Sequence, residues 1–190
     1  MRLFHSFLAE AARKSQISAG PTISMEPMML ISPELNAAIN EEIGLEFFAS
    51  HQYINIAAYY ENRGLRKLAA LFYKQGDEER GHALKFIKYI TATGGKVEIP
   101  AIVAPKTSFD SVEATLQLSL DWEIEVTKRC NNLMTLAVEQ KDYAAQDFLR
   151  WFVTEQVEEV MSMENLLSVL QQGGGERSII MLEAYLVHAD

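Results

Sequence analysis

The sequence has a single cysteine, Cys130, and no apolar run of the roughly 20 residues that span a bilayer. One cysteine excludes an intrachain disulfide framework, and it excludes a zinc or iron–sulfur site built from four cysteines of one chain. Basic residues are also few: 17 lysines and arginines face 26 acidic residues, which gives a net charge of −9. We therefore expect no membrane and no nucleic-acid partner, because nucleic-acid binding depends on neutralising phosphates. An acidic chain suits the binding of cations, or the charge simply keeps the protein soluble.

Proline is scarce and confined to a few places, at positions 21, 27, 33, 100 and 105. Because proline breaks helix interiors, the long stretches without it can form long helices. Start signals support this prediction: Ser32 precedes Pro33, Asp110 and Glu113 fit a capping box, and Asp142 fits an N-cap. The sequence predicts four long helices and a short fifth one, at residues 34–62, 65–93, 109–139, 142–171 and 176–187.

The connections between these helices predict the topology. The turns at Gly64 and near Lys141 are tight, so each joins an antiparallel pair of helices. The connection at residues 94–109 is far longer than a hairpin turn needs, and it can run the length of a bundle. We therefore predict an all-α fold, a four-helix bundle with one long crossover and a short fifth C-terminal helix, formed by residues 31–190.

Residues 1–30 differ from the rest and are interpreted as an N-terminal extension. The stretch from Met1 to Ser24 carries three basic residues against the single acidic Glu10, and it lacks the apolar core of a secretory signal. Three interpretations stay open: a targeting segment, a functional tail, or upstream sequence that is not translated. Translation could then start at Met25, Met28 or Met29. We expect a cytoplasmic protein, or an organellar one if residues 1–24 are a transit peptide.

One glutamate interrupts the apolar stripe of each long helix, near its midpoint. These residues are Glu46, Glu79, Glu123 and Glu159. In an antiparallel bundle the midpoints share one level, so four carboxylates would meet in the core. Buried carboxylates without partners cost several kcal/mol each, and no lysine or arginine occupies the stripes. Bound cations are the simplest solution, and such ligands favour iron or manganese.

His82 lies three residues after Glu79, on the same helix face. A Glu-x-x-His pair on a bundle helix is typical of di-iron carboxylate proteins. By itself the pair is weak evidence, since a histidine on an apolar face is more often a core residue, and a single glutamate is more often at a boundary with its head in solvent. The pair together with three matched glutamates on the other helices favours a metal centre.

The chain resembles ferritins of the bacterial non-haem type, over residues 31–190. The resemblance rests on four segments that contain the interior glutamates: 43–46 with Tyr53, 76–82, 121–123 and 152–159. It implies a ferroxidase centre in which Glu46, Glu79 and His82 hold one iron. Glu79 would bridge to a second iron held with Glu123 and Glu159.

The resemblance also implies roles for residues around the two irons. Tyr53 and Gln156 would hydrogen-bond to the ligands, and Glu78, Glu155 and Glu158 would join Glu159 in a third iron site. From the charges alone, those three glutamates are equally compatible with an ordinary surface. Arg80 stands where bacterioferritins carry a haem-ligating methionine, so we expect no haem.

The function implied by the resemblance is iron storage and detoxification. Fe(II) would be oxidised with O2 or H2O2, and the ferric mineral would be kept in a hollow shell of about 24 subunits. Three alternatives remain: another di-iron oxidase or peroxidase, a DNA-coating mini-ferritin, or a four-helix scaffold without chemistry. Other di-iron enzymes usually carry a second Glu-x-x-His pair, the mini-ferritin lacks a fifth helix, and the scaffold leaves the four glutamates unexplained.

Overall fold

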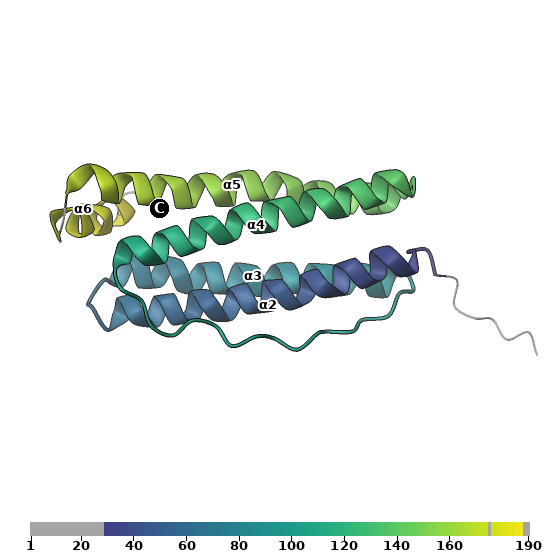
Figure 1. Cartoon of the computed structure of the whole chain (residues 1–190), viewed down its shortest axis with the longest axis horizontal. Coiled ribbons are helices and arrows are strands. Elements are labelled where there is room, and N and C mark those ends of the chain that lie inside the picture. Colours follow the sequence, from purple (N-terminus) through teal and green to yellow (C-terminus); the bar gives the residue numbers. More distant parts are fainter. Residues whose placement is uncertain (1–28, 175, 188–190) are drawn as a thin grey trace, which may run out of the picture.

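The protein is all-α, as predicted. A computed structural model describes residues 29–174 and 176–187, and this part contains five helices and no strand. The helices are α2 (Pro33–Glu61), α3 (Arg66–Ala92), α4 (Val112–Glu139), α5 (Tyr143–Gly173) and α6 (Glu176–Val187). Figure 1 shows four long helices lying side by side, with α6 at one end of the bundle. None of the helices in this part is long and apolar enough to cross a membrane.

The predicted N-terminal extension, residues 1–30, lies outside the described residues except for Met29 and Leu30. The backbone N–H of Leu30 donates to the carbonyl of Thr93, at 2.8 Å, so the described chain begins beside the end of α3. The three interpretations of the extension stay open.

Two of the three predicted helix starts are confirmed. The side chains of Ser32 and Asp142 accept hydrogen bonds from the backbone N–H three residues later, as N-caps do. The predicted start of the third helix at residue 109 is wrong. Ser111, not Asp110, caps α4, because its extended backbone brings its hydroxyl to the N–H of Ala114. Glu113 does not complete a capping box and instead accepts from Gln171.

The tight turns join α2 to α3 and α4 to α5, as expected. Gly64 has φ +74°, a conformation that glycine adopts without strain. Lys141 takes the equivalent place in the second turn with φ +56°, which is uncommon for a residue with a Cβ. Each turn produces an antiparallel helical hairpin, and the two hairpins together form the bundle.

The long crossover between α3 and α4 follows α2 along its length (Figure 1). Near its start, Asn40 donates to the carbonyl of Lys96 and accepts from the N–H of Glu98. Further on, the Gln52 amide makes the same pair of bonds with the backbone of Lys106. Buried side-chain amides on α2 therefore fix the crossover at two points.

The hydrophobic core consists of two clusters separated by a polar layer. One cluster contains Tyr53, Tyr60 and Phe72, and the other contains Phe86 and Phe152. On each long helix, residues of one cluster precede the predicted site residues and residues of the other cluster follow them. The boundaries fall at residues 43–49 of α2, 72–83 of α3, 120–126 of α4 and 152–163 of α5. The four interior glutamates therefore share one level of the bundle, as predicted.

Candidate metal centre

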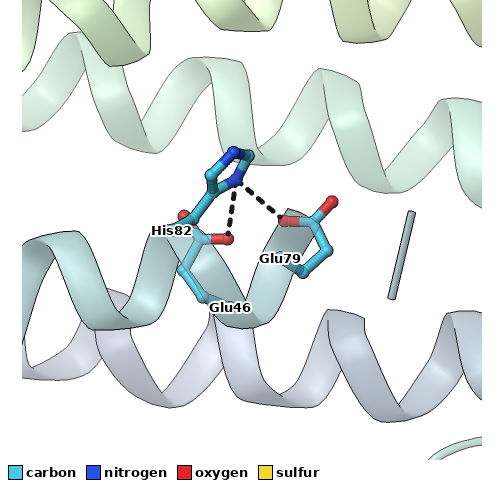
Figure 2. Close-up of side chains that lie close together, drawn as sticks. All are labelled: Glu46, Glu79 and His82. Carbon is cyan, nitrogen blue, oxygen red and sulfur yellow. Dashed lines mark hydrogen bonds and ion pairs between the residues drawn. The ribbon is translucent and has the colours of Figure 1, made fainter. Parts of the chain in front are cut away.

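Glu46 from α2 and the pair Glu79 and His82 from α3 converge in the buried polar layer. The Nδ1 atom of His82 lies 3.2 Å from Glu79 Oε2 and 3.8 Å from Glu46 Oε2 (Figure 2). All three side chains are buried, and one potential ligand atom from each lies within 4.8 Å of the others. Glu46 Oε2 has no hydrogen-bond partner. The group offers two carboxylates and one imidazole at distances that suit a single metal ion.

Glu123 lies on the α4 side of the same layer and is held by hydrogen bonds from two directions. The Tyr53 hydroxyl donates to its Oε1 atom, and the Gln156 amide donates from α5. Thr127 fixes that amide, because its hydroxyl lies 3.0 Å from Gln156 Oε1. Tyr53 and Gln156 therefore both contact Glu123, one of the predicted ligands.

Glu159 completes the layer from α5. Its Oε2 atom accepts a hydrogen bond from the side chain of Gln75 on α3. Gln75 is buried, and the sequence analysis missed it. Its position four residues before Glu79, on the same helix face, was the signal that could have identified it.

Burial of these acids makes their charged forms unfavourable. It raises the pKa of Glu46 and Glu79 well above the usual range, and the charge of Glu123 adds to both shifts. Burial and the charge of Glu123 raise the pKa of Glu159 to about 7. A bound divalent cation would displace protons from these carboxyl groups, because carboxylate ligands must be deprotonated to bind a metal.

The pKa of His82 is subject to opposing effects. Burial lowers its pKa, but the hydrogen bond and the charge of Glu79 outweigh burial and raise it overall. The imidazole ring also packs edge-on against Trp151 and Phe152, with centroid distances of 5.3 and 5.9 Å. These contacts fix the ring, so a nitrogen is held toward the two carboxylates.

The residues of the predicted third iron site are less closely grouped. Glu78 is half-buried and forms an ion pair with Lys74 at 3.2 Å, while Glu155 is half-buried and Glu158 is exposed. None of them joins the one compact group of possible ligands found among residues 29–174 and 176–187. Glu78 nevertheless lies close enough to Glu159 to raise the pKa of that carboxyl.

A further buried acid, Glu42, lies one turn before Glu46 and was not predicted. Arg129 on α4 donates to its Oε2 atom through Nε, at 2.8 Å. The sequence analysis found no basic residue in the apolar stripes, and Arg129 does lie outside them. Its long side chain reaches the interior because arginine can bury its stem and place its head against a carboxylate. Glu42 therefore has a guanidinium partner within the protein, although burial outweighs that partner and raises the pKa of the carboxyl.

Comparison with known proteins agrees with this arrangement. A family model described as a ferritin-like domain matches residues 36–173. The bacterial non-heme ferritin of Staphylococcus aureus (strain USA300) is 38% identical over 153 residues, which cover 80% of this chain and 92% of the relative. The bacterial non-heme ferritin of Staphylococcus epidermidis is 39% identical over the same length.

Solved structures give the same result. An open pore ferritin from the hyperthermophilic archaeon Archaeoglobus fulgidus superimposes with a TM-score of 0.80 at 31% identity. The match covers 84% of this chain and 99% of the archaeal one. A closed form engineered from the same archaeal ferritin matches with a TM-score of 0.79 at 30% identity. Sequence and fold together establish that this chain belongs to the ferritin family.

Proposed function

We propose that the protein stores iron and that it oxidises Fe(II) at the buried polar layer before storage. The observation that carries the proposal is the convergence of Glu46, Glu79 and His82 at one level with Glu123 and Glu159. Iron is the substrate of this site. Glu46, Glu79 and His82 hold the first ferrous ion, and Glu79 also reaches the second ion, which Glu123 and Glu159 hold. Tyr53 and Gln156 keep Glu123 in position.

The carboxylates favour oxidation because hard oxygen ligands bind ferric iron better than ferrous iron. Two ferrous ions at adjacent sites each lose one electron. One dioxygen molecule takes both electrons and two protons and becomes hydrogen peroxide. If peroxide is the oxidant instead, it takes two electrons and two protons and becomes two water molecules. Paired sites therefore avoid the release of one-electron products.

Storage requires a container, and we propose a hollow shell of about 24 copies of this chain. Two observations support it: membership of the ferritin family, and the names of the relatives, which are ferritins. We propose that Glu78, Glu155 and Glu158 form, with Glu159, a third iron site. We propose a cytoplasmic location. Fluorescent fusions of the full chain and of residues 25–190 would distinguish it from an organellar one.

Aerobic loading tests storage directly. The full chain receives many equivalents of ferrous iron per subunit, and size exclusion then follows protein and iron together. We expect iron to elute with a very large assembly. A small species that retains about two irons per chain would indicate a different di-iron enzyme. No retained iron would contradict the proposal and favour a scaffold without chemistry.

A double substitution tests the site. Glu79→Gln with Glu123→Gln keeps the shape of the side chains and removes two ligand charges. We expect the rate of iron oxidation to fall at least about 100-fold, because each ion loses a ligand. Glu125→Gln is the matched control, since Glu125 lies two residues from Glu123 but points into solvent beside Lys128. The control should oxidise iron at the normal rate.

A further inference from the structure

A pocket of about 220 Å³ lies between α2 and α4, next to the metal centre. We call it the α2–α4 pocket. Its walls include Ala49, Gln52 and Tyr53 from α2, and Leu118, Ser119 and Trp122 from α4. Its surface is almost entirely apolar.

The polar groups in the pocket walls are already engaged, with one exception. The Gln52 amide bonds to the backbone of Lys106, and the Ser119 hydroxyl donates to the carbonyl of Thr115. The Tyr53 hydroxyl donates to Glu123. Only the indole N–H of Trp122 is buried without a partner. A buried water needs two to four polar partners, so one donor does not hold water in the pocket.

Two residues that line the pocket lie beside the candidate metal centre. The Tyr53 ring borders the pocket, and its hydroxyl touches a ligand of the second iron. Trp122 is the residue directly before that ligand, Glu123. On α2, Ala49 lies between Glu46 and Tyr53, one turn from each. The pocket therefore shares Tyr53 with the candidate metal centre, and it is bordered on α4 by the residue next to Glu123.

We propose that the α2–α4 pocket holds dioxygen on its way to the irons; the proposal rests on the ferroxidase function proposed above. Dioxygen is small and apolar, and apolar cavities of about 150 Å³ in proteins stay dry and bind xenon or benzene. Hydrogen peroxide does not fit this pocket, because its two hydroxyl groups would lose hydrogen bonds to water without replacement. Ferrous iron is excluded for the stronger reason that it carries charge. Dioxygen thus uses a path separate from that of the ions.

Xenon is the first probe, because it binds where dioxygen does and takes no part in the reaction. Crystals of the full chain are pressurised with xenon and its anomalous scattering is measured. We expect a xenon atom in the α2–α4 pocket of the wild-type protein and none in Ser119→Leu, where the larger side chain fills the space. Absence of xenon from the wild-type pocket would overturn the proposal, whether or not the protein oxidises iron.

Kinetics with the two oxidants form the second test. For Ser119→Leu we expect the KM for dioxygen to rise at least about fivefold, with the rate at saturating dioxygen and the rate with peroxide unchanged. Leu118→Trp narrows the pocket from its half-buried rim and should act in the same direction if Ser119→Leu does not fold. Ser162→Leu is the matched control, because it makes the same change in a different pocket, between α3, α5 and α6.

The results separate the two proposals. An unchanged KM for dioxygen in both pocket variants would overturn the role of the pocket and leave the ferroxidase function intact. An equal loss of rate with both oxidants would also overturn it, because general damage to the site does not distinguish dioxygen from peroxide. A wild-type protein that uses neither oxidant would overturn the ferroxidase function itself.

Discussion

The hydroxyl groups of Tyr53 and Tyr60 are equally buried but have different partners. Tyr53 donates to Glu123, whereas Tyr60 pairs with the Thr115 hydroxyl. Both rings pack edge-on against Phe72. Phenylalanine at either position keeps the ring and removes one hydrogen bond, which costs about 1 kcal/mol.

We therefore expect Tyr53→Phe and Tyr60→Phe to lower the free energy of unfolding by similar amounts, whereas only Tyr53→Phe slows iron oxidation, by about tenfold. Denaturant unfolding and stopped-flow oxidation measure the two effects. Equal oxidation rates in the two variants would show that the hydroxyl of Tyr53 does not position Glu123.

The raised pKa of Glu159 predicts how stability depends on pH in the metal-free protein. The folded state holds a proton on Glu159 up to about pH 7, whereas the unfolded state releases it near 4.5. The folded state therefore binds more protons between these values, and the free energy of unfolding falls as pH rises from 4.5 through 7. The shifts of Glu46, Glu79, Glu123 and His82 have the same sign.

For Glu159 alone the loss approaches about 3 kcal/mol above pH 7. Denaturant unfolding of the metal-free protein at pH 5 and pH 8 measures it, and Glu159→Gln should lose less stability over this range. Glu158→Gln, which changes an exposed neighbour, should behave as the wild type does. Greater stability of the wild type at pH 8 would contradict the prediction. Iron binding has the opposite trend and tightens as pH rises, because iron displaces the protons.

The sequence was sufficient to predict that the interior glutamates and His82 meet in the core, and the resemblance added Tyr53 and Gln156, but Gln75 and Arg129 were not predicted. The positions of the predicted ligands can be derived from the helical period and from the midpoints of antiparallel helices, which depend on local sequence and on helix length. The positions of residues such as Gln75 and Arg129 cannot be derived in this way. Gln75 meets Glu159 across 84 residues, and Arg129 meets Glu42 across 87. Such pairs depend on how far apart two helices pack and on the rotation of each helix about its axis, which hydrophobic spacing leaves loosely defined.

The start of α3 also depends on a contact that local sequence does not predict. Its first residues have no side-chain cap from their own segment. Glu183 on α6 supplies one instead, because its carboxylate accepts from the backbone N–H of Lys67 and Leu68, at 3.1 and 2.8 Å. A carboxylate at a helix N-terminus also interacts favourably with the helix dipole. The short α6 is thereby fixed to the bundle by an interaction across 115 residues, which no local signal could reveal.

We expect Glu183→Ala to lower the free energy of unfolding by about 1–2 kcal/mol, since the cap and its charge are both lost. Limited proteolysis should also cut faster in the turn between α5 and α6. Glu183→Gln should recover part of the stability, because the amide oxygen still accepts one hydrogen bond. Glu164→Ala, at an exposed position on α5, serves as the control. Unchanged proteolysis in Glu183→Ala would show that α6 is held by its apolar contacts alone.

In the molecule as a whole, the polar layer joins the two helical hairpins at the centre of the bundle. Glu46, Glu79 and His82 belong to the α2–α3 hairpin, and Glu123 and Glu159 belong to the α4–α5 hairpin. The layer interrupts the hydrophobic core at the level where apolar contacts between the hairpins would otherwise be continuous. Burial raises the pKa of all four carboxyl groups at this level. A cation held by ligands from both hairpins would therefore strengthen the interaction between them.

Ferrous iron added without oxygen should accordingly stabilise the fold. A ligand that binds only the folded state at 100 times its Kd adds about 2.7 kcal/mol, which corresponds to a rise in Tm of roughly 5–10 °C for a domain of this size. Glu123→Gln with Glu159→Gln removes the ligands on one hairpin, so this variant should show a smaller rise. Glu125→Gln with Glu164→Gln changes two exposed acids on the same helices and should match the wild type. Anaerobic calorimetry at several iron concentrations measures each case. An equal rise in the interior and exposed variants would mean that iron binds without joining the hairpins, and that the second site is not built from α4 and α5.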